Sequence, residues 1–182
     1  MMYNTYVNSP QQVQIAADAG IGEVLIEHKQ LSIGSGVDNH AFIEIVSAAK
    51  EHHLKCVLDW SCNLTTEQLE AGLMLIQLLD PNTHLFAVRV KDLGALMALE
   101  LKFPKLPIQL TVEGHTYNIP GLKRLLKGRP RPLDRLALGH QIPIKTMPSF
   151  AVALSPLVPL ELMVLGPTLL YTSPRKLLSG EK

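Results

Sequence analysis

Residues 85–115 read LFAVRVKDLGALMALELKFPKLPIQLTVEGH, and they contain the clearest structural pattern of the chain. It opens as an apolar, β-branched run, continues through Lys91-Asp92-Leu93-Gly94 into an apolar helical pattern, and closes with a second strand-like run after Pro107. Two strands that are apolar on both faces and joined by a helix of about ten residues must pair in parallel, because a hairpin needs no such crossover. The stretch therefore predicts one βαβ unit.

The rest of the chain repeats this unit. Helical patterns with capping signals, such as the capping box of Thr65 and Gln68, separate further runs that are typical of strands. With the two from the opening stretch, the strand-like runs are residues 3–7, 23–28, 55–60, 85–90, 108–113, 133–140 and 160–165. Their alternation with helices indicates either a (β/α) barrel or an open doubly wound sheet.

Two observations favour the barrel. No glycine-rich phosphate fingerprint follows the first strand, as a dinucleotide-binding open sheet would show. Polar residues stand at the ends of nearly every strand and are not concentrated at one switch point. We therefore predict an α/β fold, a TIM-like (β/α) barrel of about seven parallel strands that forms one domain over residues 1–182. A typical barrel has eight strands, so the count leaves open whether this one closes. The expected buried strand residues are Val24, Ile26, Val57, Val88, Val90, Leu110, Leu136, Leu138 and Met163.

The composition fits a globular protein with an apolar interior. Of the 182 residues, 47% are hydrophobic and 18% are charged, which excludes disorder as the dominant state. The net charge is only +1, and prolines interrupt the basic cluster between Lys123 and Arg135, so we expect no nucleic-acid partner. The sequence shows neither an apolar run of about 18 residues nor a signal peptide, which predicts no membrane contact and a cytoplasmic location.

Cys56 and Cys62 are the two cysteines of the chain. Two thiols cannot form a disulfide framework, and without further cysteines there is no thiolate set for a zinc or iron–sulfur site. We therefore expect two free thiols, no bound metal and no cofactor.

Polar side chains stand at the carboxyl ends of the predicted strands, which in a barrel converge on the mouth where such enzymes place their active sites. The candidate catalytic residues among them are Glu27, Asp59, Glu113, His115 and His140. Carboxylates and imidazoles in one cavity could act as general acid and base or bind a divalent metal, and closely spaced carboxylates should raise one of their pKa values. The competing interpretation is that such residues are helix caps or loop residues, which the position of Asp92 directly before a helix favours for that residue.

A family resemblance rests on three stretches: VRVKDLGALMALELKFPKLPIQLTVEGHTYN, RLALGHQIPIKTM and LELMVLGPTLLYTSPRKLLSG. They resemble the N-terminal barrel domain of the peptidase U32 (collagenase-like protease) family, with agreement of order and spacing over roughly residues 23–180. The matching residues are Asp92, Gly94, Pro104, Pro107, Asn118, Arg135, Gly166, Ser173, Arg175 and Leu177-Leu178-Ser179. The resemblance implies a TIM-like barrel and a hydrolase of the peptidase type.

The departures from the family pattern bear on function. Where the family has His-x-Ser-Thr-Gln, residues 109–113 here read QLTVE, and where it has Arg-Glu this chain has His140 and Gln141. The family's closing His and two Cys fall on Leu165, Leu169 and Lys176. In members that act as oxygen-independent hydroxylation proteins for ubiquinone or RNA, such cysteines hold an iron–sulfur cluster. The resemblance therefore implies that this chain holds no cluster at those positions.

Two functional hypotheses follow. The first is a cluster-free U32-like barrel that works as an accessory or binding subunit, beside a cluster-bearing relative as in ubiquinone hydroxylation pairs. The second is a peptidase-like hydrolase or a lyase, with an acid–base or metal site that receives a small molecule or peptide at the C-terminal mouth of the barrel. No His-Glu-x-x-His run, Gly-x-Ser-x-Gly elbow or Cys-His nucleophile pair in the sequence supports a protease mechanism directly.

An incomplete barrel would leave strand edges unpaired. We expect such an edge either to be covered by residues 171–178 of the tail or to pair with a protein partner or a second copy of the chain. The first case fits a monomer, and the second fits an accessory subunit.

Overall fold

The computed structural model describes residues 2–32, 36–61, 65–79, 85–112, 118–139 and 142–162, in which strands and helices alternate. The strands are β1 (Asn4–Tyr6), β2 (Glu23–Glu27), β3 (Lys55–Trp60), β4 (Ala87–Val90), β5 (Ile108–Val112), β6 (Arg135–Leu138) and β7 (Leu160–Leu162). The helices are α1 (Pro10–Asp18), α2 (Asn39–Glu51), α3 (Thr66–Leu78), α4 (Leu93–Lys102), α5 (Ile119–Lys127) and α6 (Met147–Leu154), with a short 3-10 helix, η2 (Ile144–Thr146), before α6.

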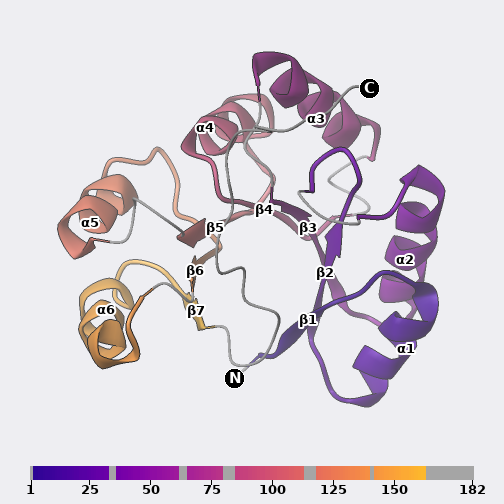
Figure 1. Cartoon of the computed structure of the whole chain (residues 1–182), viewed down its shortest axis with the longest axis horizontal. Helices are drawn as coiled ribbons and strands as arrows, with labels where there is room; N and C mark the ends of the chain where they lie inside the picture. Colours follow the sequence, from indigo (N-terminus) through magenta and orange to yellow (C-terminus); the bar gives the residue numbers. More distant parts are fainter. Residues whose placement is uncertain are drawn as a thin grey trace, which may run out of the picture.

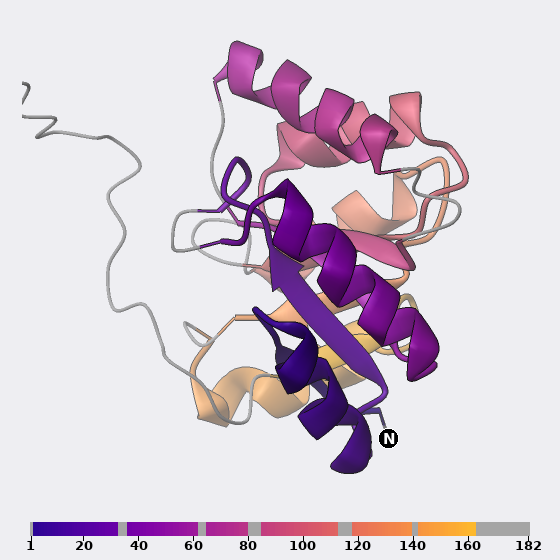
Figure 2. The same ribbon diagram turned by 90° about the vertical axis from the view of Figure 1, so that its right-hand side faces the viewer.

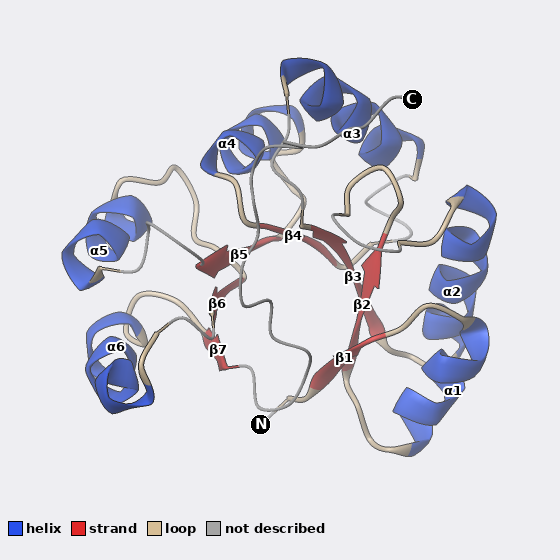
Figure 3. Cartoon of the chain, in the orientation of Figure 1, coloured by secondary structure: helices blue, strands red, loops and turns tan. Residues whose placement is uncertain are grey.

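The strands form one curled parallel sheet. Each strand pairs in parallel with the next strand in sequence, so the order within the described residues is β1-β2-β3-β4-β5-β6-β7. The sheet curls around an interior, and the helices lie on its outer side (Figure 1, Figure 3). This confirms the predicted TIM-like α/β fold with seven parallel strands in the described part of the chain. The edges of the sheet are β1 and β7.

Side-chain caps determine where several helices begin. Thr65 and Gln68 form the predicted capping box at the start of α3. Asp92 is the N-cap of α4, because its Oδ1 accepts a hydrogen bond from the amide of Ala95 at 2.8 Å. The competing interpretation of Asp92 is therefore correct. None of the helices among the described residues is long and apolar enough to span a membrane.

The main core lies between the sheet and the helices. Figure 2 shows α1 and α2 along the outer side of β1 and β2. On α3, a Cβ at Gly72 would lie 2.6 Å from the Trp60 ring, so glycine lets this helix approach β3 closely. Met163 lies outside the described residues, and the other eight predicted core residues are buried: Val24, Ile26, Val57, Val88, Val90, Leu110, Leu136 and Leu138.

The inner side of the sheet carries polar residues. The sequence predicts that the strands of residues 85–115 are apolar on both faces, and this prediction is wrong. Val88 and Val90 belong to the outer core, whereas Arg89 and its register partner Gln109 are buried on the inner face. Charged and amide groups are tolerated there because they bond to one another. The predicted parallel pairing of β4 and β5 is confirmed.

Candidate functional site

A row of inward-facing polar residues runs around the sheet. The register pairs are Glu27 with Asp59, Asp59 with Arg89, Arg89 with Gln109, and Gln109 with Arg135. Strands in a barrel are tilted and their register is staggered, so a row of register partners climbs or descends as it goes round. This row starts at Glu27, the last residue of β2, and ends at Arg135, which bonds to Glu23, the first residue of β2. One end of the row therefore lies at the carboxyl ends of the strands, and we call it the mouth end. The other end lies at the level of the amino end of β2, and we call it the lower end.

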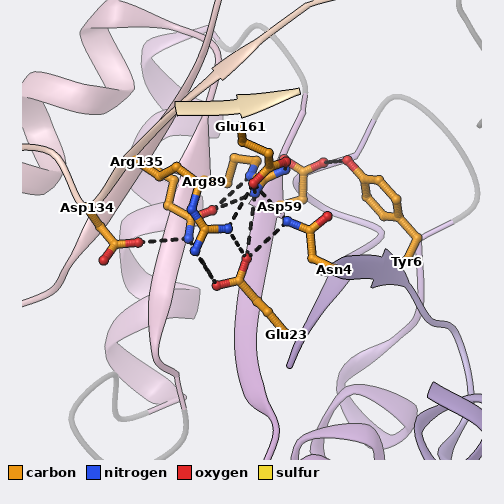
Figure 4. Close-up of polar contacts among 9 residues, drawn as sticks. Asn4, Tyr6, Glu23, Asp59, Arg89, Asp134, Arg135 and Glu161 are labelled. Atoms are coloured by element: carbon orange, nitrogen blue, oxygen red, sulfur yellow. Dashed lines mark hydrogen bonds and ion pairs between the residues drawn. The ribbon is translucent and has the colours of Figure 1, made fainter. Parts of the chain in front are cut away.

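The lower end forms a dense polar cluster, drawn in Figure 4. The lower cluster comprises Asn4, Glu23, Arg89, Gln109, Arg135 and Glu161. Arg89 donates from Nη1 and Nη2 to the two carboxylate oxygens of Glu161, at 2.8 and 2.7 Å. The same guanidinium donates from Nε and Nη2 to Oε1 of Gln109, at 2.9 and 2.7 Å. All three nitrogens of Arg89 are therefore engaged within the cluster.

Bonds of the lower cluster also cross the open side of the sheet. Asn4 of β1 donates to Glu161 of β7 at 2.8 Å. Arg135 of β6 donates from Nη1 to Glu23 of β2 at 2.7 Å and to Glu161 at 2.9 Å. Within the described residues no backbone pairing joins β1 to β7. Side chains therefore link the two edges of the sheet.

In the lower cluster two carboxylates face two guanidinium groups, and Asp134 adds a third carboxylate beside it, which accepts a hydrogen bond from Nε2 of Gln109 at 3.0 Å. Glu23 and Glu161 face Arg89 and Arg135, and the Glu23 side chain is 0% exposed. Burial alone would raise the pKa of Glu161, but the Arg89 charge and the hydrogen bonds from Arg135 and Arg89 hold that pKa below its usual value. Buried charges that are paired and hydrogen-bonded in this way offer little reactivity, and removing one partner would leave another charge buried and unpaired.

The mouth end carries four polar residues, which we call the mouth group: Tyr6, Glu27, Asp59 and Ser61. The Tyr6 hydroxyl donates to Oδ2 of Asp59 at 2.6 Å, as Figure 4 shows. The Ser61 hydroxyl donates to Oε1 of Glu27 at 2.9 Å. Asp59 is 1% exposed, and its Oδ1 is buried without a hydrogen-bond partner among the described residues. Trp60 Nε1 and Arg129 Nε are also buried without a partner in the described part of the chain, but Asp59 is the one of the three that lies at a strand end beside a second carboxylate, Glu27.

The environment of Asp59 favours its protonated form. Burial raises the pKa of Asp59 the most, and the charge of Glu27 adds to the rise, whereas the hydrogen bond from Tyr6 and the charges of Arg89 and Lys91 oppose it. Burial together with the Asp59 charge also raises the pKa of Tyr6, although half of the Tyr6 side chain is exposed. The sequence attributes a raised pKa to closely spaced carboxylates, and in the structure burial is the larger cause. A carboxyl group of this kind suits a general acid.

The structure describes two of the five candidate catalytic residues. Glu27 and Asp59 are register partners on neighbouring strands, and both belong to the mouth group. The other three lie outside the described residues, so the convergence of all five on one cavity stays a prediction: Glu113, His115 and His140. His28, at the end of β2, faces outward, where its ring packs edge-on against Phe42 and its Nε2 lies 2.8 Å from Oδ1 of Asn39.

Sequence reasoning missed Tyr6 and the lower cluster. A usable signal exists for the cluster, because its charged members interrupt apolar strands one at a time, as in AVRV, RLAL and LEL. Such alternation is typical of a strand with one apolar and one polar face. Tyr6 carries no comparable signal, since tyrosine is common in strands of every kind.

Within the described residues, no group of three or more His, Cys, Asp or Glu side chains could hold a metal ion. Cys56 is a free thiol, and burial raises its pKa to about 12, with a smaller contribution from the charge of Glu23. A buried thiol of that pKa stays protonated near neutral pH and is therefore a poor nucleophile. Cys62 lies outside the described residues, so the expected lack of metal and cofactor stays a prediction for the whole chain.

Comparison with known proteins supports the fold. No protein-family model matches the sequence, and no curated protein matches it. The solved structure of the U32 peptidase Mk0906 is similar, with a TM-score of 0.62 and 12% identity, over 89% of this chain and 67% of that chain. The present chain has a U32-like fold. A glycerophosphodiester phosphodiesterase from Parabacteroides distasonis ATCC 8503 is also similar, with a TM-score of 0.59 and 9% identity, over 88% of this chain and 78% of that chain. At these identities the similarity shows a shared TIM-barrel-like fold alone.

Proposed function

We propose that this U32-like barrel is a hydrolase with an acid–base site at its C-terminal mouth, in which Asp59 is the general acid and Glu27 the general base. The observation that carries the proposal is the buried Asp59 carboxyl, with an unpaired Oδ1 and a raised pKa, next to a second carboxyl group. Two carboxyl groups in different environments allow one to give a proton while the other takes one. The two similar structures are by name a peptidase and a phosphodiesterase, which supports the same reaction class.

In this proposal each oxygen of Asp59 has its own role. Tyr6 donates to Oδ2, so the proton of the neutral acid resides on the unpaired Oδ1. During hydrolysis Asp59 would give this proton to the leaving group as the scissile bond breaks. Glu27 would accept a proton from the attacking water, whose oxygen forms the new bond. A lyase would use the same two groups without the water.

The proposal is tested with three substrates that sample hydrolase classes: bis(p-nitrophenyl) phosphate, p-nitrophenyl acetate and fluorescein-labelled gelatin. Asp59→Asn and Glu27→Gln should each lower the rate on the accepted substrate about 100-fold or more. Glu44→Gln, which changes an exposed carboxylate on α2, serves as the control and should keep the wild-type rate. Equal rates for wild type and Asp59→Asn would contradict the role of Asp59.

A second candidate is a cluster-free accessory or binding subunit that pairs with a cluster-bearing relative, as in ubiquinone or RNA hydroxylation. The residues at the closing positions of the family favour it, because Leu165, Leu169 and Lys176 stand there in this chain and cannot ligate iron. The backbone edges of β1 and β7, which only side chains link within the described residues, would provide the surface for a protein partner or a second copy.

Two measurements test the accessory role. Protein purified without oxygen should show no iron–sulfur absorption and no bound metal by elemental analysis, and a visible cluster spectrum would contradict a cluster-free subunit. Size-exclusion chromatography with light scattering should show self-association or a complex with a co-expressed U32-family protein. A monomer under both conditions would contradict association through the sheet edges.

A further inference from the structure

Asp59 and Arg89 are neighbours that do not bind each other. They are register partners on β3 and β4, and both side chains face the inner side of the sheet. Among the described residues, no hydrogen bond or ion pair joins them, although Oδ1 of Asp59 is buried and lacks a donor. A guanidinium beside a buried carboxyl group normally pairs with it, because the charged hydrogen bond offsets the burial of both groups. An additional contact must therefore keep Arg89 away.

The contacts of Arg89 show what holds it. Glu161 of β7 accepts from Nη1 and Nη2, and Gln109 of β5 accepts from Nε and Nη2. Glu161 is itself held by Arg135 and Asn4, at 2.9 and 2.8 Å, so its carboxylate has a fixed position. The guanidinium of Arg89 is therefore directed into the lower cluster and away from the mouth group.

Arg89 is one of two cations in the described residues whose charges act on Asp59. The titratable and charged groups that face Asp59 are Tyr6 of β1, Glu27 of β2, Arg89 of β4, and Lys91, which directly follows β4. Of these, Arg89 is the cationic register partner of Asp59 on the adjacent strand. The position of its guanidinium therefore determines whether this cation can form an ion pair with Asp59, which would favour the ionised carboxylate.

We propose that Glu161 is a positioning residue of the mouth site, which holds the Arg89 guanidinium in the lower cluster and so keeps the proton on Asp59. This inference rests on the proposed role of Asp59 as the general acid. The position of the guanidinium can nevertheless be tested without a substrate, because it alters the titration of Asp59 itself. Gln109 assists by engaging Nε of Arg89.

The test is an NMR titration of the Asp59 carboxyl carbon in three proteins: wild type, Glu161→Gln and Glu161→Gln/Arg89→Met. Glu161→Gln releases the guanidinium, which can then bind Oδ1 of Asp59, and the pKa of Asp59 should fall by roughly 1 to 3 pH units. The double variant has no guanidinium at this position, so the pKa of Asp59 should return to the wild-type value or above. Any turnover found for the wild type should show the same displacement in its pH–rate profile.

Glu100→Gln is the matched control. Glu100 on α4 accepts a hydrogen bond from Arg129 at 2.7 Å, and both side chains are buried, so the substitution removes a similar carboxylate from a similar pair elsewhere in the molecule. The pKa of Asp59 should not change. If Glu161→Gln fails to fold by circular dichroism, Glu161→Asp keeps the charge and withdraws the carboxylate by one methylene, which should lower the pKa of Asp59 by less.

Two results would overturn the inference. One is an unchanged pKa of Asp59 in a folded Glu161→Gln or Glu161→Asp variant. The other is a lowered pKa that persists in Glu161→Gln/Arg89→Met, because the guanidinium would then not be its cause. Neither result removes the general-acid role of Asp59, which depends on the rate of Asp59→Asn. Conversely, a lack of hydrolysis with the expected titration would contradict the proposed function and leave the positioning of Arg89 intact.

Discussion

The lower cluster and the mouth group lie on the same inner face of the sheet, but they differ in how completely their buried polar atoms are hydrogen-bonded. In the lower cluster, Arg89 and Arg135 satisfy two carboxylates, and every nitrogen of Arg89 has an acceptor. In the mouth group, Asp59 is equally buried, yet one of its oxygens has no partner among the described residues. Burial of a polar group is therefore not sufficient to make a reactive site. A reactive group needs a neighbour that could neutralise it and is held away.

The largest loss of stability is expected when the ion pairs of Arg135 in the lower cluster are removed. Arg135→Met leaves the fully buried Glu23 with Arg89 as its remaining ion-pair partner, at 3.8 Å, and should lower the free energy of unfolding by about 3 to 5 kcal/mol. Urea denaturation measures the change. Arg131→Met is the control, because Arg131 donates to the backbone carbonyls of Pro104 and Phe103 outside the cluster, and it should have a smaller effect. Equal losses would contradict a special role for the lower cluster.

The outer face of the same strand provides the next comparison. Leu138 on β6 is 3% exposed in the apolar core between the sheet and the helices. Leu138→Ala should lower the free energy of unfolding by roughly 2 to 5 kcal/mol, because it leaves a cavity. Leu162→Ala, at a half-exposed position of β7, should change the free energy far less in the same denaturation assay. A negligible change for Leu138→Ala would place that residue outside the core.

A smaller effect, with a defined pH dependence, is expected for Glu161. Its folded-state pKa lies below the usual value, so its contribution to stability is present above about pH 4.3 and is lost as the pH falls through the folded-state pKa. Glu161→Gln should therefore lower the free energy of unfolding by roughly 1.5 to 3 kcal/mol near neutral pH, and by progressively less in acid. Urea denaturation at several pH values measures both quantities. A loss that is constant with pH would show that the Glu161 charge is not the cause.

Substitution of Asp59 should change the free energy of unfolding in the opposite direction and by the smallest amount. Its folded-state pKa is raised, so the ionised form is penalised in the folded protein and stability falls as the pH rises from the unfolded-state pKa through the folded-state pKa. Asp59→Asn should raise the free energy of unfolding by about 1 kcal/mol near neutral pH, and the gain should vanish below about pH 4. Thermal melts at both pH values measure it. Destabilisation at neutral pH would indicate that the mouth group is structural, like the lower cluster.

Local interactions account for what the sequence determined by itself. The Thr65 and Asp92 caps accept hydrogen bonds from amides three residues away. Such short-range contacts can be predicted from the sequence, and they predict where α3 and α4 begin. The alternation of strands and helices determined parallel pairing, because each crossover returns the chain in the same direction. These local patterns therefore determined an α/β fold with a parallel sheet.

Only the tertiary structure decided which polar residues meet. Arg135 and Glu23 are 112 residues apart, Arg89 and Glu161 are 72 apart, and Tyr6 and Asp59 are 53 apart. The curl and stagger of the sheet bring these pairs together, and neither quantity can be read from local composition. The sequence therefore identifies Glu27 and Asp59 as polar strand ends. The position of the Arg89 guanidinium, on which the protonation of Asp59 depends, exists only once seven strands have curled around one interior.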